Sequence, residues 1–241
     1  MKMFSKSDVG KKRTDNQDSF IAVEFDNGAV FAVVCDGMGG ASSGNVASAL
    51  AVKTISNYVL NSYSPKMNGS AIENMLRAAV DSANTEVYES AGRDHKLFGM
   101  GTTAVVCIVV DNLAHIVHVG DSRAYLVTQD GLERLTNDHS VVQSMIDKGE
   151  ISEEEAKSHP KKNIITRALG AEETVFCDYN IAIKPEMNAL LICTDGLTNY
   201  VSENDIFEVI KTVPQEDAVD RLIELANNGG GGDNITAVLI Y

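Results

Sequence analysis

Residues 29–40 read AVFAVVCDGMGG, and the rest of the chain is organised around this stretch. Its apolar run, residues 29–35, ends at Asp36 and is followed by a segment with three glycines. A continuous apolar run bounded by glycine is typical of a buried strand. A carboxylate there is costly to bury unless a cation pairs with it, and glycines let the backbone approach that cation. Taken alone, this stretch is equally well interpreted as a strand and a turn with a solvated Asp36.

The same pattern, an apolar run that delivers an aspartate beside a glycine, recurs along the chain. Residues 113–121 read LAHIVHVGD, and residues 189–196 read ALLICTDG. Asp233 arrives differently, after four glycines and just before the apolar run 235–240. These repeats predict one acidic site that is built from distant parts of the chain. An all-oxygen site without clustered cysteine or histidine favours Mg²⁺ or Mn²⁺ over zinc.

Composition limits the class of protein. The 241 residues, 44% of them hydrophobic, suffice for a sizeable core, and no linker or repeat divides them. The net charge of −14 argues against binding to nucleic acid or to an anionic membrane. The sequence has no apolar run long enough to span a bilayer, and its first residues lack the apolar core of a signal peptide. We therefore expect a cytoplasmic protein.

The four cysteines carry no metal-binding or disulfide pattern. Cys35, Cys107 and Cys193 lie inside apolar runs, and none of the four, Cys177 included, forms a CxxC pair. This distribution predicts buried thiols in a reducing compartment.

The first half of the chain predicts a hairpin and two helices. Residues 19–24 alternate, a turn signal follows, and the strand of the opening stretch comes next, so the two strands pair antiparallel. Residues 45–58 and 70–91 have helical apolar stripes that should cover one face of a sheet. Ser70 and Glu73 have the spacing of a capping box at the start of the second helix.

The second half predicts a meander, an insertion and a closing strand. Short links between the strands imply antiparallel pairing of neighbours in sequence. The helical segment between strands is expected on the surface as a lid or flap. The predicted strands are 103–110, 113–119, 123–128, 175–182, 189–193 and 235–240, with helices beginning at Ser202 and Pro214.

The polar segment 11–18, KKRTDNQD, has neither a helical nor a strand period. One interpretation is a solvated loop. The other is a binding segment in which Arg13 grips an anion while Asp18 lies near the metal ions.

Seven short motifs in order along the chain are similar to those of a known family. They are RTDNQD (13–18), DGMGG (36–40), GTT (101–103), GDSR (120–123), LTNDHS (135–140), TDGL (194–197) and GDN (232–234). On these motifs the chain resembles the metal-dependent protein phosphatases of the 2C class, the PPM family of serine/threonine phosphatases, in their compact bacterial form. The match runs from about Asp8 to Tyr241.

The resemblance implies an α+β fold in which two packed antiparallel β-sheets are flanked on both outer faces by pairs of α-helices. It implies a single catalytic domain over residues 1–241, with a flap at about 140–170. It also implies a catalytic set of Arg13, Asp36 and Asp195, in which Arg13 binds the substrate phosphate. The metal ligands that it implies are Asp18, Asp36, Gly37, Asp121, Asp195 and Asp233.

The resemblance further implies how these ligands divide among Mn²⁺ or Mg²⁺ ions. Asp36 would bridge two central ions, the Gly37 carbonyl would be a ligand, and Asp195 and Asp233 would complete the pair. Asp18 would act through bound water. Asp121, together with Asp195, would hold a weaker third ion.

The chemistry that follows is hydrolysis of phosphoserine and phosphothreonine by direct attack of a metal-bridging water, whose pKa the ions lower. An arginine such as Arg13 can make a forked contact to phosphate oxygens. Met38 stands where many eukaryotic members carry a histidine, so the proton donor is unassigned. His118, His139 and His159 are expected to be structural or flap residues instead.

Two other functions fit the same sequence. One is a catalytically inactive sensor or binding module on the same fold, against which the intact set of ligands argues. The other is a hydrolase of small phosphate esters. For the phosphoprotein phosphatase, the expected partners are phosphoserine and phosphothreonine proteins, including a serine/threonine kinase, and the expected state is a monomer.

Overall fold

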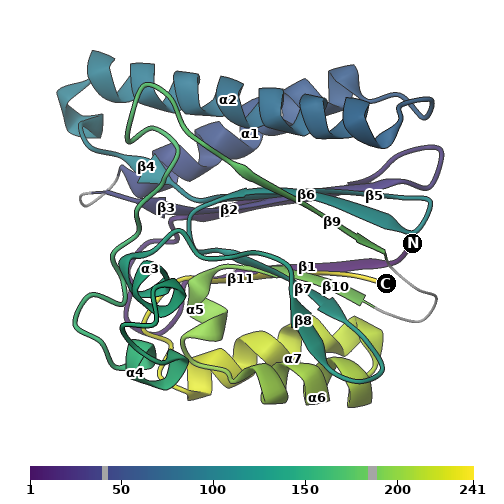
Figure 1. Cartoon of the computed structure of the whole chain (residues 1–241), viewed down its shortest axis with the longest axis vertical. Coiled ribbons are helices and arrows are strands. Elements are labelled where there is room, and N and C mark those ends of the chain that lie inside the picture. The colour runs from purple at the N-terminus through teal and green to yellow at the C-terminus, as the bar shows by residue number, and fades with distance from the viewer. Residues whose placement is uncertain (40–42, 184–188) are drawn as a thin grey trace.

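The structure, a computed structural model, describes residues 1–39, 43–183 and 189–241. Gly40 of the opening stretch therefore lies outside the described residues. Figure 1 shows four layers, in which two helices, a sheet, a second sheet and two further helices are stacked on one another. The expected α+β fold of two antiparallel sheets with helix pairs on both outer faces is confirmed.

The first sheet contains most of the opening stretch as β3, which has a neighbouring strand on each side. Its path is β2 (Asp18–Glu24), β3 (Val30–Met38), β5 (Ala104–Val110), β6 (Leu113–Val119) and β9 (Asp178–Ile183), and β4 (Gly101–Thr102) pairs with the end of β3. All of these pairs are antiparallel. The hairpin of β2 and β3 is as predicted, but β3 continues past Asp36, because β4 pairs with Gly37 and Met38.

The second sheet joins the two ends of the described chain. Its order is β1 (Met3–Asp8), β11 (Ile235–Ile240), β10 (Ala189–Cys193), β7 (Arg123–Val127) and β8 (Leu132–Arg134). Its pairs are antiparallel as well. The closing strand predicted from the sequence thus lies between the first strand and β10.

Each sheet carries a pair of helices on its outer face. These are α1 (Gly44–Ser62) and α2 (Gly69–Arg93) on the first sheet, and α6 (Glu203–Thr212) and α7 (Gln215–Asn228) on the second. The shorter helices are η1 (His95–Leu97), α3 (Val141–Asp147), α4 (Glu153–Lys157) and α5 (Asp195–Thr198). Ser202 caps α6 by accepting the Asp205 backbone N–H, as expected. Among the described helices, none is long and apolar enough to cross a membrane.

The core is divided into three layers, and β5 shows why. Alternate residues of this strand, such as Val106 and Ile108, pack under α1 and α2, whereas Val105 and Val109 pack between the two sheets. A strand that is buried on both faces needs apolar residues at every position, and AVVCIVV supplies them. The third layer lies between the second sheet and α6–α7.

The meander predicted across the middle of the chain is wrong at one link. β6 and β7 do not pair, because β6 belongs to the first sheet and β7 to the second. Residues 120–122 carry the chain from one sheet to the other. Periodicity within a strand does not tell which of two sheets the strand joins, and the short link alone favours a hairpin.

The predicted capping box at the start of α2 is also wrong. The N-cap is Asn68, whose side chain accepts the backbone N–H of Ala71. The helix begins earlier than Ser70, and Glu73 instead pairs with Arg77 one turn later. A capping box does occur in the flap, where Ser152 and Glu155 satisfy each other's backbone N–H groups at the start of α4.

Candidate active site

Two of the predicted site aspartates face each other across one pair of strands. Asp18 is the first residue of β2, and its antiparallel partner in β3 is Asp36. Like charges directly opposite each other on a sheet are destabilising. This pair therefore requires compensation from elsewhere in the site.

Asp18 is held by hydroxyl groups from the second sheet. Its Oδ2 accepts hydrogen bonds from Thr194 Oγ1 at 3.0 Å and Thr236 Oγ1 at 2.6 Å, whereas its buried Oδ1 has no partner among the described residues. Burial raises the pKa of Asp18 to about 7, the two threonines oppose this rise, and the charges of Asp195 and Asp233 add to it. The two threonines thus fix the carboxylate of Asp18 through Oδ2, while Oδ1 accepts no hydrogen bond from the described residues.

The backbone of Asp36 is fixed by hydroxyl groups of the next strand. Its N–H donates to Thr103 Oγ1 at 2.9 Å, and its carbonyl accepts from Thr102 Oγ1 and the Thr103 N–H, both at 2.8 Å. Thr103 Oγ1 also pairs with Ser122 Oγ at 2.7 Å. The position of Asp36 is therefore linked to the segment that crosses between the sheets.

The side chain of Asp36 is the focus of the negative charge. Burial raises the pKa of Asp36 well above its ordinary value, and the remaining rise comes from four aspartates. In order of effect these are Asp18, Asp195, Asp121 and Asp233. The structure thus brings all five predicted carboxylates into one electrostatic neighbourhood.

Asp121 and Asp195 come from two different connections. Asp121 lies in the crossing between the sheets, and burial, followed by repulsion from Asp195 and Asp138, raises its pKa to about 7. Asp195 begins α5 directly after β10. Its Oδ2 accepts from Asn199 Nδ2 at 2.9 Å, and its buried Oδ1 has no partner in the described chain. Burial raises the pKa of Asp195 too.

Arg13 pairs with the fifth carboxylate. Its Nη2 donates to Asp233 Oδ2 at 2.9 Å, and about half of the Arg13 side chain is exposed. Asp233 Oδ1 accepts the N–H of Asn234, whose side-chain amide donates to the carbonyls of Val9 and Asp15. These contacts tie the polar segment near the N-terminus to the carboxylate cluster.

Gly37 lies where no side chain fits. A Cβ there would stand 2.0 Å from the Gly44 carbonyl oxygen and 2.6 Å from that of Gln17. The start of α1 therefore packs directly against the backbone of β3. The backbone at Gly37, beside Asp36, is therefore closely packed.

A cleft adjoins this acidic centre. It has a volume of about 600 Å³, begins at Asp121 and Asp195, and continues between the flap helices α3 and α4 on one side and residues 198–204 on the other. Figure 1 shows both flap helices beside α5. The cleft leads from the carboxylates to solvent along the flap.

The donor set fits divalent cations. Within the described part of the chain, one buried carboxylate oxygen of Asp18 and one of Asp195 have no hydrogen-bond partner. Burial and mutual repulsion raise the pKa of four aspartates. Hard cations such as Mg²⁺ and Mn²⁺ prefer such oxygen ligands and would compensate their charge. The thiols take no part in this set, because Cys35 and Cys193 are buried in apolar layers and burial raises the pKa of both.

Sequence reasoning missed the hydroxyl groups that hold the carboxylates. Thr236 was counted only as part of an apolar strand, and the roles of Thr103, Ser122 and Thr194 were not recognised. The available signal was a threonine inside an otherwise apolar run, as in ITAVLI, which must find a hydrogen bond once buried.

Comparison with known proteins identifies the family of the chain. A family model described as Protein phosphatase 2C matches residues 10–228. The serine/threonine phosphatase stp of Listeria monocytogenes is 38% identical over 236 residues, which are 98% of this chain and 93% of that protein. The solved structure of the S. agalactiae serine/threonine phosphatase has a TM-score of 0.92 and 36% identity, and the match covers 100% of this chain and 98% of that chain.

A second solved structure is of the catalytic domain of the serine/threonine protein phosphatase PstP in complex with two manganese ions. It has a TM-score of 0.85 and 32% identity, and the match covers 99% of this chain and 96% of that chain. The chain belongs to the protein phosphatase 2C family. It is an enzyme of the metal-dependent phosphatase class, and an inactive sensor on this fold is not favoured.

The charge balance of the site generates a prediction about stability. In EDTA at mildly alkaline pH, Asp36→Asn is expected to raise the melting temperature, because it removes a charge that burial and four aspartates oppose. Each 1 kcal/mol or so of relieved repulsion corresponds to about 2–4 °C. In excess Mn²⁺ the order should reverse, since only the wild type keeps the full gain from cation binding. Scanning calorimetry measures both.

Asp26→Asn is the matched control, since Asp26 is an exposed aspartate in the turn between β2 and β3. It should change neither melting temperature. If Asp36→Asn melts lower than the wild type in EDTA, the carboxylate stabilises the metal-free fold and the repulsion argument is wrong.

Proposed function

We propose that this chain is a phosphoprotein phosphatase that hydrolyses phosphoserine and phosphothreonine. The observation that carries the proposal is the convergence of five aspartates from both sheets on one neighbourhood beside an open cleft. The names of the relatives support the substrate class, because they are serine/threonine phosphatases.

For the metals, we propose two central Mn²⁺ or Mg²⁺ ions and a weaker third. Asp36, the Gly37 carbonyl, Asp195 and Asp233 would hold the central pair, and Asp18 would act through water. Asp121 and Asp195 would hold the third ion. The unpartnered oxygens of Asp18 and Asp195 support this assignment, as does the similarity to a structure with two manganese ions. Bound divalent ions supply Lewis acidity and lower the pKa of a coordinated water toward neutrality.

The protein side chains then have to bind and orient the phosphate. Arg13 is the candidate, because its guanidinium lies at the acidic centre and retains donors beyond the one on Asp233. Its pair with Asp233 is half-exposed, so it is weak enough to exchange for a phosphate dianion. Asp36 and Asp195 would complete the catalytic set. Phosphate bound at Arg13 would face the carboxylate cluster and its compensating cations.

The cleft favours a peptide over a small phosphate ester. It is larger than one phosphorylated side chain needs, and flap residues such as Gln143 and Lys157 line its far side. A peptide on either side of the phosphorylated residue would have room along the flap. We therefore extend the proposal to one catalytic domain with a flap at about 140–170, acting as a cytoplasmic monomer on phosphoproteins that include a serine/threonine kinase.

The decisive experiment is a metal-dependence assay on a phosphothreonine peptide and on p-nitrophenyl phosphate. Both activities are expected to need Mn²⁺ or Mg²⁺, to vanish in EDTA and to return when Mn²⁺ is restored in excess. Inhibitors of the okadaic-acid type should have no effect. Full turnover of the peptide by a preparation verified to be metal-free would contradict the mechanism, and hydrolysis of the small ester alone would favour the small-ester alternative.

Arg13→Ala is expected to raise KM for the phosphopeptide more than it lowers kcat, since the contact exists in both the ground state and the transition state. Loss of a charge-assisted contact of about 1.5–3 kcal/mol corresponds to roughly ten- to hundred-fold. Arg13→Lys should recover only part of this, because lysine cannot make the forked contact. The control is Lys12→Ala, an exposed neighbour of the same charge. An unchanged KM for Arg13→Ala would remove Arg13 from the phosphate site.

The proposed division of ligands predicts different losses for two aspartate variants. Asp121→Ala should still bind two Mn²⁺ ions by titration calorimetry yet turn over poorly, because the central ligands remain. Asp36→Asn should weaken both central ions, because it removes a charge that they share. A melting curve distinguishes these outcomes from unfolding. The third-ion role is wrong if Asp121→Ala loses the central pair, or if it keeps full turnover at every Mn²⁺ concentration.

A further inference from the structure

A buried histidine outside the carboxylate cluster contacts the crossing between the sheets. His139 makes two hydrogen bonds to the same residue, Gly120. Its backbone N–H donates to the Gly120 carbonyl at 3.0 Å, and its ring Nδ1 accepts the Gly120 N–H at 3.1 Å. Both polar groups of the Gly120 backbone are therefore satisfied by one residue, and the next residue in the chain is Asp121.

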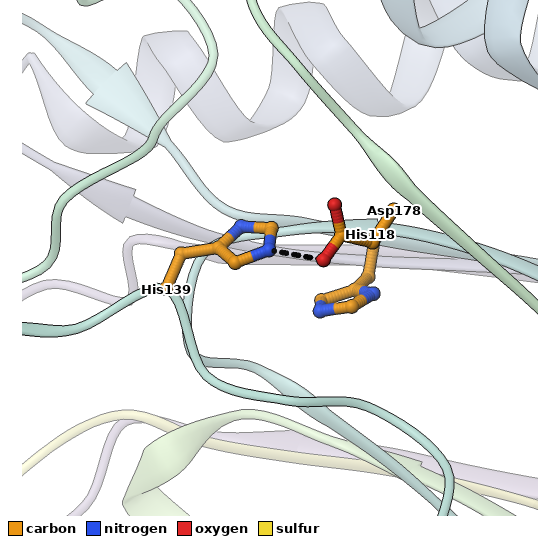
Figure 2. A group of neighbouring side chains, drawn as sticks. All are labelled: His118, His139 and Asp178. Atoms are coloured by element: carbon orange, nitrogen blue, oxygen red, sulfur yellow. Dashed lines mark hydrogen bonds and ion pairs between the residues drawn. The ribbon is translucent and has the colours of Figure 1, made fainter. Parts of the chain in front are cut away.

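These contacts fix the tautomer of the ring. Because Nδ1 accepts a hydrogen bond, the proton of neutral His139 lies on Nε2, which donates to Asp178 Oδ2 at 3.1 Å (Figure 2). Arg167 Nη1 donates to the other oxygen, Oδ1, at 2.9 Å. Arg167 Nη1 also lies 3.1 Å from Nε2, but both nitrogens carry hydrogens, so this contact is not a hydrogen bond. Burial lowers the pKa of His139 and so favours the neutral ring.

The same histidine reaches the end of the flap. Its carbonyl accepts the Thr166 N–H at 2.7 Å, and Arg167 follows in sequence. A chain of contacts thus runs from Gly120 through His139 and Asp178 to Arg167. It connects the crossing between the sheets with the segment that returns from the flap.

Gly120 occupies a closely packed position that favours glycine. Its φ of +100° is rarely adopted by other residues, and a Cβ there would stand 2.5 Å from the Thr103 methyl carbon. The Thr103 hydroxyl in turn contacts the Asp36 N–H. A hydrogen bond that holds the Gly120 backbone therefore also orients the backbone of the next residue, Asp121.

The cluster could instead be a metal site, since His118, His139 and Asp178 each offer one ligand atom within 4.8 Å of the others. His118 Nε2 donates to the Asn137 carbonyl at 2.8 Å, and its buried Nδ1 has no partner among the described residues. The Arg167 guanidinium, however, already brings a positive charge to both His139 Nε2 and Asp178. A metal ion would have to displace it, so the geometry favours a hydrogen-bonded brace.

We propose that His139 is a positioning residue that holds Asp121 in place through Gly120 and couples it to the flap through Asp178 and Arg167. The inference rests on the proposed role of Asp121 as a metal ligand. In this proposal His139 touches neither metal nor substrate, and yet it sets the affinity of the site for the third metal ion. His118, which stacks on the His139 ring with centroids 4.7 Å apart, packs the ring in this orientation.

Two variants of His139 separate the two sides of the ring. His139→Asn places an amide oxygen near the position of Nδ1 and keeps an acceptor for the Gly120 N–H. His139→Gln places its amide nitrogen near the position of Nε2 and keeps the donor to Asp178, but loses that acceptor. His115→Asn is the control, since His115 is another buried histidine, on β6, whose Nδ1 bonds to the Tyr179 hydroxyl.

Three measurements use the full chain. The first is hydrogen exchange of the Gly120 amide by NMR in metal-free protein, expected to be faster in His139→Gln than in wild type or His139→Asn. The second is titration with Mn²⁺ alone, in which the ion beyond the central pair should bind roughly five-fold more weakly in His139→Gln, as expected for one lost hydrogen bond. The third is the Mn²⁺ dependence of kcat. In His139→Gln it should shift to higher Mn²⁺ concentration, in line with the weaker binding, while KM for the peptide stays constant. His115→Asn should change none of these.

Equal Gly120 exchange in wild type and His139→Gln would overturn the inference, as would equal Mn²⁺ affinity in the Asn and Gln variants. The exchange measurement needs no metal and no substrate. Absence of phosphatase activity in the wild type would therefore refute the proposed function while leaving the link between His139 and Gly120 tested on its own.

Discussion

The structure depends on one unfavourable interaction, the mutual repulsion of carboxylates that are partly buried between two sheets. Asp18 and Asp36 face each other across one pair of strands, and Asp195 and Asp233 add their charges from the other sheet. Repulsion of this kind would drive the sheets apart at this end if it stood alone. The apolar layer between the two sheets holds them together away from the site.

Hydroxyl groups make this arrangement specific. Thr194 and Thr236 bind one oxygen of Asp18, and Thr103 binds the Asp36 backbone. A threonine fits an apolar strand through its methyl group while its hydroxyl reaches a carboxylate, so these positions satisfy the core and the site together. These hydroxyl groups do not compensate the negative charge of Asp18 and Asp36, but they fix the positions of the two residues. Such preorganised oxygen donors need little rearrangement to accept a hard cation.

The sequence predicted most elements for physical reasons that are local, and the repeated apolar run ending in an aspartate predicted that these aspartates lie together, as they do. The run AVVCIVV had to be a doubly buried strand, and the stripe of α2 had to cover a sheet. β1 was missed, because MFSKSD is the half-polar sequence of an edge strand. The crossing at residues 120–122 was missed, because strands of both sheets place apolar residues in the layer between the sheets, and their sequence patterns look alike. Only the tertiary structure decides which sheet a strand joins.

That crossing explains why Asp121 differs from the other carboxylates. Asp36 and Asp18 lie in paired strands, whose ladders hold them. Asp121 lies in a three-residue link with no ladder of its own, beside a glycine in a rare conformation. Its position must therefore come from contacts made by other segments, and Ser122 to Thr103 and Gly120 to His139 are two such contacts. Because His139 also binds the strand that follows the flap, a displacement of that segment would reach Asp121 before it reached Asp36. With the role proposed for His139, Asp121 is therefore linked through Gly120 and His139 to the segment that returns from the flap.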